Sequence, residues 1–166
     1  MLKKIMIALA LALPMLASAQ TVKIGLIDTA SILGDHPDTK AAQTKFDETS
    51  KRYETEYRGL VEEMNRRMEE FQKMKDDELP AIRERKTREL QEFQQKIQDF
   101  QTTADRDLQK LQQDLMAPVM QKVRQAIESV GKEGNYTLLL ELSSALYYGA
   151  PAEDITAAVK TKLGLQ

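Results

Sequence analysis

The chain has 166 residues and a net charge of −2; 30% of its residues are charged, 5% are aromatic, and cysteine and tryptophan are absent. This mild acidity gives no support for a nucleic-acid partner, which calls for a basic face. Without cysteine there is no disulfide framework, so packing or association between chains must stabilise the fold. Such a composition is more typical of a long solvated helix than of a compact core.

The first 19 residues have the features of a secretory signal peptide. Two lysines precede an apolar run from Ile5 to Leu16, and the small residues at 17–19 fit a signal-peptidase site. The apolar run is shorter than the roughly 20 residues that span a bilayer, so an uncleaved anchor is the weaker interpretation. We expect cleavage before Gln20 and export of a chain of 147 residues with a net charge of −4.

The mature chain is expected to open with a strand and a helix start. Apolar and other residues alternate from Val22 to Asp28, which predicts a strand with one buried face. The segment from Ser31 to Gly34 is expected to form a turn or a short helical segment. The tetrapeptide 35–38 then marks a helix start, because Pro37 suits the first helical position and acidic residues suit the positive end of the helix dipole.

Two long helices are predicted between positions 37 and 130. Apolar residues from Phe46 to Phe71 recur at spacings of three, four or seven between charged and amide residues, which predicts a helix with a narrow apolar stripe. From Leu90 to Leu115, apolar residues step by three and four in a heptad-like seam. The segment 76–80 separates the two patterns, and Pro80 can begin the second helix. We expect an antiparallel hairpin, or arm, with its tip near 76–80.

The second helix carries one interruption and one end signal. Pro118 removes a backbone hydrogen bond, so a kink or a restart is expected there. Gly131 and Gly134 are expected to end the helix in the left-handed conformation.

The last part of the chain is expected to complete a small sheet. Residues Asn135 to Leu142 predict a mostly buried strand, and a tight turn at 143–144 leads to a third short strand from Ala145 to Tyr148. The segment 149–151 ends the sheet, and a closing helix follows from 154 onward.

These lengths favour an oligomer. Helices of about 40 and 50 residues would be about 60 and 75 Å long, whereas a compact domain of this size would be only about 40 Å across. Segments 20–36 and 131–166 remain for a small β/α body that is too small to be stable alone. We therefore expect an α+β fold in which the bodies of two or three copies pack together. The expected oligomerisation core is Ile24, Leu26, Ile27, Leu138, Leu139 and Leu140.

No set of residues that catalysis requires stands out. The chain has a single histidine, His36. Asp28, Asp35 and Asp38 lie near it in the sequence and could form a metal site with it, but an acidic helix start explains the same residues without a metal. The segment 131–134 lacks the spacing of a phosphate-binding loop. We predict a protein that is not an enzyme and uses neither a cofactor nor a metal.

The order of elements over the whole mature chain resembles the Skp/OmpH family of periplasmic chaperones for outer-membrane proteins. The resemblance rests on the strand at 22–28, the polar hairpin, the glycine-ended second helix, the apolar strand at 136–142 and the close at 154–156. It implies a jellyfish-like homotrimer in which a small β body carries three helical tentacles around a central cavity. It also implies ATP-independent capture of unfolded outer-membrane proteins in the periplasm.

The charge of this chain departs from that of the strongly basic members of the family. Its isoelectric point is near 5.6. The expected tip mixes the two signs of charge, through Lys73, Lys75, Asp76, Asp77 and Glu78. The sequence therefore does not support contact of the tips with membrane or lipopolysaccharide, nor strong electrostatic capture of acidic unfolded proteins.

A stripe of methionine and aromatic side chains lies toward the expected tip. Most of these side chains are expected to hold the two helices together, because a two-helix arm has little else to bury. Others are expected to contact the bound unfolded protein, or client, because methionine is flexible and polarizable. The candidate client-binding region comprises Met64, Met68, Phe71, Met74, Leu79, Ile82 and Phe93.

Two functions of different classes fit the same helical seams. In the first, the arms hold an unfolded β-barrel precursor by many weak contacts and prevent its aggregation. In the second, the protein is a structural coiled-coil spacer or adaptor of the cell envelope with a folded partner. Protection of unfolded proteins from aggregation distinguishes the two.

Overall fold

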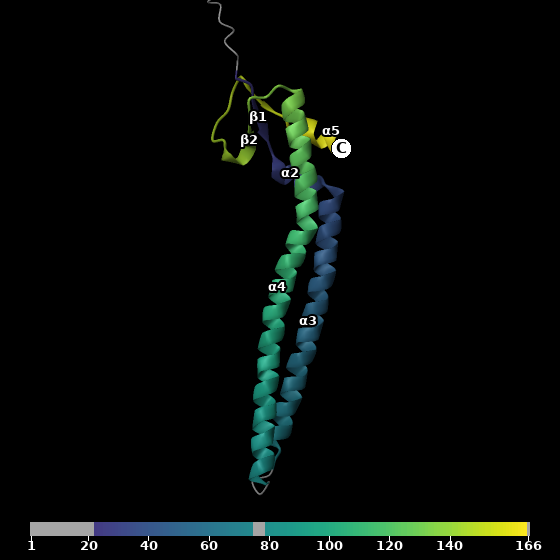
Figure 1. Ribbon diagram of the computed structural model, residues 1–166, viewed down its shortest axis with the longest axis vertical. Coiled ribbons are helices and arrows are strands. Elements are labelled where there is room, and N and C mark those ends of the chain that lie inside the picture. Colours follow the sequence, from purple (N-terminus) through teal and green to yellow (C-terminus); the bar gives the residue numbers. More distant parts are fainter. Residues whose placement is uncertain (1–21, 75–78, 166) are drawn as a thin grey trace, which may run out of the picture.

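The computed structural model describes residues 22–74 and 79–165. The elements are, in chain order, β1 (Ile24–Ile27), α2 (Thr29–Asp35), α3 (Pro37–Gln72), α4 (Pro80–Glu133), β2 (Leu138–Glu141), the 3-10 helix η2 (Leu142–Ser144), β3 (Ala152–Asp154) and α5 (Thr156–Lys162). Figure 1 shows α3 and α4 side by side as one long arm, with the strands and α5 gathered around the upper end of α4. The expected signal peptide at 1–19 and its cleavage before Gln20 lie outside the described residues.

The arm is an antiparallel helix pair with a constant register. Three contacts between the helices mark this register: Asp38 with Lys122 near the root, Tyr53 with Asp107 midway, and Arg67 with Phe93 toward the tip. Successive contacts are separated by equal numbers of residues on the two helices, so the pairing does not slip. With 36 residues in α3 and 54 in α4, the helices are about 54 and 81 Å long at 1.5 Å per residue.

Both arm helices begin where the local sequence predicts. Pro37 and Pro80 occupy the first helical position, where the missing backbone N–H of proline leaves no intrahelical bond unmade. His36 caps α3, because its Nδ1 accepts a hydrogen bond from the Asp38 backbone N–H at 3.1 Å. His36 is only 5% exposed. Over residues 22–74 and 79–165, no three histidine or carboxylate side chains gather as metal ligands would.

Helix α4 runs through Pro118 without restarting. Proline inside a helix costs about 3 kcal/mol. Val119 and Val123, on the turns that follow, are 3% and 2% exposed. Complete burial of a side chain of this size contributes roughly 1.5–3 kcal/mol, so the packing of the two valines offsets the cost of the proline.

The sheet is parallel, with β1 between β2 and β3. The prediction of a third strand from Ala145 to Tyr148 is wrong, because these residues form no strand and β3 comes after them. Leu146 and Tyr147 have the apolar character of a strand, but they are fully or almost fully exposed. Strand β3 carries Glu153 and Asp154, and it joins β1 through its backbone rather than through an apolar face.

The core of the body lies between one face of the sheet and the helices α2, α4 and α5. The buried core residues are Ile27, Ile32, Val123, Ala126, Ile155 and Val159. Lys160 links α5 to α2 at the edge of this core. Its Nζ donates to the Ser31 hydroxyl at 2.7 Å and to the Asp35 carboxylate at 2.6 Å. The Lys160 ammonium also holds the pKa of the Asp35 carboxyl below its usual value.

A charged cluster ties the three strands together near their beginnings. The Tyr136 hydroxyl donates to the Glu153 carboxylate at 2.6 Å. Lys23 Nζ lies 4.1 Å from the centre of the Tyr136 ring and 3.4 Å from Glu153. The hydrogen bond from Tyr136, followed by the one from Lys23, holds the pKa of Glu153 below its usual value. The cluster thus links the residue before β1, the approach to β2 and the middle of β3.

The end of α4 differs from the prediction of left-handed glycines. Gly134 caps the helix with a φ of −85°, and the left-handed residue is Asn135, with a φ of 52°. Asparagine tolerates this conformation because its short polar side chain can hydrogen-bond locally. Gly131 lies inside the last turns of α4 and is buried.

The buried glycines make room for one leucine of β2. A Cβ atom on Gly25 of β1 would lie 2.6 Å from Leu139 Cδ2, and one on Gly131 of α4 would lie 2.9 Å from Leu139 Cδ1. Leu139 is therefore wedged between β1 and α4, and its two methyl groups lie close to the two glycines, one on each element. This wedge joins the end of the arm to the sheet.

We expect Gly25→Ala to lower the free energy of unfolding by about 1–3 kcal/mol, because the added methyl group overpacks the Leu139 site. The matched control is Gly34→Ala in α2, where an added Cβ meets nothing within 4 Å. The control should be neutral or stabilising by up to about 1 kcal/mol, because alanine favours a helix over glycine. Denaturant unfolding followed by circular dichroism measures both, and equal stability of the two variants would contradict the wedge.

Candidate binding surfaces

The predicted client-binding stripe does not form one uniform surface. Phe93 is 9% exposed and lies in the seam between α3 and α4. The partly buried members are Met64, Phe71, Met74 and Ile82. Met68 and Leu79 are 42% and 66% exposed. These last two therefore present the most open apolar surface of the set.

Cationic side chains cover the aromatic rings of the lower arm. The Arg67 guanidinium lies 4.5 Å from the centre of the Phe93 ring, and Lys96 Nζ lies 5.5 Å from the same centre. Arg83 lies 5.9 Å from the centre of the Phe71 ring. A cation over a ring is attracted by the ring quadrupole. The apolar periodicity could not reveal these contacts, because it counts only apolar residues; the arginines placed near the aromatic positions were the available signal.

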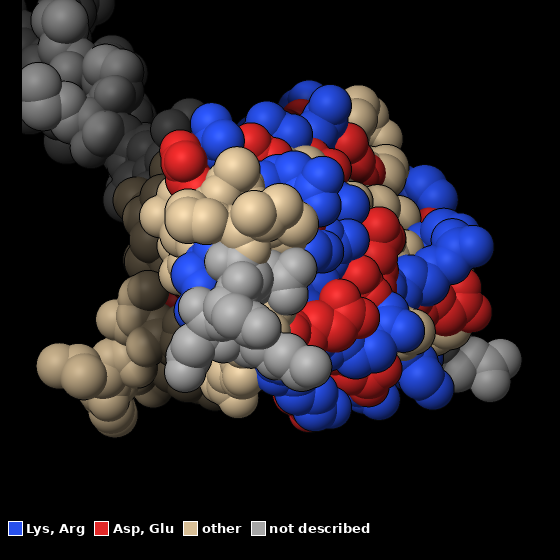
Figure 2. All heavy atoms as spheres, turned by 90° about the horizontal axis from the view of Figure 1, so that it is seen from below, with Lys and Arg blue, Asp and Glu red and all other residues tan. Residues whose placement is uncertain are grey.

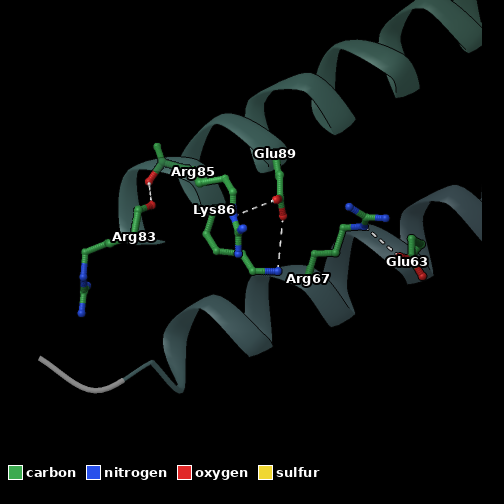
Figure 3. Close-up of polar contacts among 7 residues, drawn as sticks. Glu63, Arg67, Arg83, Arg85, Lys86 and Glu89 are labelled. Atoms are coloured by element: carbon green, nitrogen blue, oxygen red, sulfur yellow. Dashed lines mark hydrogen bonds and ion pairs between the residues drawn. The ribbon is translucent and has the colours of Figure 1, made fainter. Parts of the chain in front are cut away.

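Carboxylates of the same helices pair with several cations of the lower arm, Arg67 among them (Figure 3). Arg67 Nε donates to Glu63 at 2.8 Å on α3. On α4, Lys86 and Arg85 lie 3.3 and 3.5 Å from the Glu89 carboxylate. Such pairs, three or four residues apart, support each helix by a few tenths of a kcal/mol. Arg67, Arg85 and Lys86 are thus positioned by their own helices, and Arg67 also reaches across the seam to the Phe93 ring of α4.

Charges of both signs alternate over the tip end of the molecule. Figure 2 shows lysine and arginine interspersed with aspartate and glutamate over the exposed side chains of this face. Interspersed charges cancel over short distances, so this face offers no field of one sign. The predicted tip residues 75–78 lie outside the described residues. Within the ranges 22–74 and 79–165, none of the helices has the length and apolar character needed to cross a bilayer.

A groove of about 630 Å³ lies between α3 and α4 midway along the arm. Tyr53 and Tyr57 of α3 and Phe100 of α4 line it, together with the carboxylates of Glu54 and Asp105. We refer to this site as the mid-arm groove. The three rings are partly buried. The sequence analysis placed these positions in an apolar seam and did not anticipate an open groove with acidic side chains.

Tyr53 forms the fixed wall of the mid-arm groove. Its hydroxyl donates to Asp107 of α4 at 3.1 Å. Its ring centre lies 5.9 Å from that of Phe100, with 54° between the ring planes, a tilted arrangement that aromatic pairs favour. Partial burial, and then the hydrogen bond to Asp107, raise the pKa of the Tyr53 hydroxyl. The ring is therefore positioned without any bound molecule.

The residues of the predicted oligomerisation core divide into an inner and an outer set. Leu26 and Ile27 are 2% and 4% exposed within the single chain, and Ile24 and Leu139 are partly buried. Leu138 and Leu140 are 47% and 44% exposed. Side chains alternate along a strand, and Leu139 points toward α4. Leu138 and Leu140 therefore lie on the opposite face of the sheet, at its β2 edge.

The segment after β2 adds further exposed apolar side chains. Leu146 and Tyr147 are fully or almost fully exposed, and Tyr148 is 47% exposed. Single exposed apolar residues are ordinary, but several on one short segment beside an apolar strand edge are typical of an interaction site. The sequence analysis missed these three residues as surface groups because it assigned them to a strand.

We expect Arg67→Gln to loosen the lower arm, because the variant removes the cation from the Phe93 ring. A loss of about 0.5–1 kcal/mol corresponds to roughly 2–5-fold faster amide exchange in local opening. Hydrogen–deuterium exchange with mass spectrometry on peptides that contain residues 60–74 and 86–97 measures this change. Arg66→Gln is the control, because Arg66 is exposed and pairs with Glu63 without contacting a ring. Equal exchange in the two variants would contradict a role for the ring contact.

Comparisons with known proteins give matches that cover most of the chain. A profile of the family described as "Outer membrane protein (OmpH-like)" matches residues 23–163. The chaperone protein Skp of Yersinia enterocolitica is 25% identical over 155 residues, which cover 92% of each chain. A solved structure from Caulobacter crescentus CB15, described as an OmpH-like outer membrane chaperone, matches with a TM-score of 0.73 and 16% identity over 85% of this chain and 83% of that one. The last match shows a common fold.

Proposed function

The chain belongs to the outer membrane protein (OmpH-like) family, and we propose that it is an ATP-independent holdase chaperone of unfolded outer-membrane proteins. The family relationship supports a chaperone role. The holdase mechanism is supported by the structure of the arm. Its two helices, of 36 and 54 residues, extend well beyond the body and present partly exposed apolar side chains. The leader-like segment at 1–19 supports action in the periplasm after export.

In this proposal the arm holds a client through many weak contacts. Met68 and Leu79 provide open apolar surface. Met64, Met74 and Ile82 can add contacts from their partly buried positions. Methionine adapts to different side chains, which suits clients of varied sequence. Each contact is weak, but contacts on several arms act together, so that the client is retained without a fixed binding geometry.

We further propose that three copies assemble through their bodies. Leu138 and Leu140 are exposed on the face of the sheet that points away from α4. Leu146 and Tyr147 extend the exposed apolar surface along the following segment. Packing of these residues against other copies would remove apolar surface from water and cover the β2 edge. The arms of a trimer would then surround a cavity in which a client is shielded from other clients.

We expect the double variant Leu138→Ser/Leu140→Ser to shift the protein toward monomer, because it removes apolar side chains from the proposed interface. Size-exclusion chromatography with multi-angle light scattering measures the mass, and circular dichroism reports whether the helices remain folded. Leu79→Ser, at a still more exposed leucine near the tip, is the control and should keep the mass of the wild type. An unchanged trimer mass in the double variant would place the interface elsewhere.

The central test is suppression of aggregation without ATP. An unfolded outer-membrane β-barrel protein is diluted from denaturant, with and without the chain that begins at Gln20, and light scattering is recorded. We expect suppression at about one trimer per client, together with a soluble complex in size-exclusion chromatography. Unchanged aggregation with several different barrels would favour the structural spacer or adaptor instead.

Shortening the arm tests whether the arm is the binding element. A variant that lacks 65–95 and joins 64 to 96 through a short Gly-Ser loop keeps the helix register, because these two positions face each other in the antiparallel pairing. We expect the oligomer mass to be retained and the suppression of aggregation to be lost. Full suppression by the shortened variant would count against the arm as the client-binding element.

A further inference from the structure

We propose that the mid-arm groove binds arginine and lysine side chains of the captured unfolded chain. This inference rests on the proposed holdase function and specifies the chemistry of one part of the client. The groove is open between α3 and α4, measures about 630 Å³, and is lined by the three rings and two carboxylates described above. Its position between both helices places it on the arm rather than on the body.

The lower arm already contains an example of the proposed binding mode. There the guanidinium of Arg67 lies over the Phe93 ring and is paired with the Glu63 carboxylate. A ring face and a carboxylate together thus hold a cation that belongs to this chain. The same two kinds of group meet again in the mid-arm groove, in larger number.

In the mid-arm groove no cation of the described residues lies among the rings, and only one of the two carboxylates has a cationic partner, which lies outside the lining. Lysine and arginine are absent from its lining, all of which is described. The Asp105 carboxylate makes no hydrogen bond or ion pair with any described residue, and the Glu54 carboxylate is paired only with the exposed Arg58, at 3.1 Å. No described cation lies over Tyr53, Tyr57 or Phe100. The groove therefore presents aromatic rings and negative charge to the solvent.

The charge of the groove decides between possible occupants. An anionic segment would be repelled by Glu54 and Asp105. A purely apolar segment would desolvate these carboxylates without pairing them, which is costly. A guanidinium or ammonium group pairs with the carboxylates while its cation lies against a ring, and its alkyl chain covers the remaining apolar surface. Charge complementarity thus selects a cationic side chain.

The closing experiment measures the binding of fluorescein-labelled, unstructured Gly-Ser peptides that carry three Arg-Leu units. Matched peptides replace arginine with lysine, with glutamine or with glutamate. Fluorescence anisotropy with the intact mature protein should show the arginine and lysine peptides binding about 10-fold or more tightly than the glutamine peptide, as expected for a ring contact and a charge pair of roughly 1–2 kcal/mol together. The glutamate peptide should bind most weakly.

Two groove variants and one control locate the effect. Glu54→Gln/Asp105→Asn should weaken the arginine peptide about 5–10-fold and leave the glutamine peptide unchanged, and Tyr57→Leu should reduce the same preference while keeping an apolar wall. Glu62→Gln/Glu92→Gln removes the same charge from exposed positions outside the groove and should have little effect. Equal binding of arginine and glutamine peptides, or an equal loss in the control, would overturn the proposal.

The experiments distinguish failure of the proposed cation site from failure of the proposed holdase function. Suppression of aggregation without discrimination among the peptides would reject the groove as a cation site and leave the holdase function in place. Discrimination among the peptides without suppression of aggregation would support the groove and reject the holdase function.

Discussion

The parallel pairing of β1 with β2 is the constraint on which the rest of the molecule depends. Parallel neighbours require a long crossover connection, and here the residues from 28 to 137 supply it as α2 and the whole arm. Because β1 and β2 are neighbours in one small sheet, the chain between them must leave the body and return to it at nearly the same place. The antiparallel pairing of α3 and α4 follows, and the Leu139 wedge between Gly25 and Gly131 holds the returning helix to the sheet.

An arm anchored only at its root must be stabilised by its own seam. Its two helices have little apolar surface to share, and cations complete the burial of the aromatic rings at Phe71 and Phe93. This construction leaves Met68 and Leu79 open, whereas a broader apolar seam would have enclosed them. A thin seam with few tertiary contacts is also easily opened locally. The proposed assembly surface on the body and the proposed binding surfaces on the arm are therefore separated along the molecule.

Charge on the arm is arranged locally rather than as a single field. Near the tip, rings and carboxylates enclose cations of the same chain, and the exposed face in Figure 2 mixes both signs. Midway, the groove has rings and carboxylates without such a cation. The combination of an aromatic ring and a carboxylate thus occurs twice on the arm. Toward the tip it holds an arginine of this chain, and midway it is open to a partner. In the proposed function, such an arm would recognise cationic and apolar features of a client at short range instead of attracting it by net charge.

The sequence by itself determined the α+β class, the two long helices and their starts at Pro37 and Pro80, because helical periodicity and proline geometry are local properties. The tertiary structure decided the parallel order β2-β1-β3 and the position of β3, since strand pairing is made by backbone groups that leave no side-chain pattern. It also decided that Leu26 is enclosed while Leu138 is exposed, and that Phe93 is covered while Met68 is open. These residues have similar apolar character. Leu26 and Leu138 lie on the same face of the sheet, but Leu26 belongs to the central strand β1 and Leu138 to the edge strand β2. For Phe93 and Met68, the packing around each side chain makes the difference.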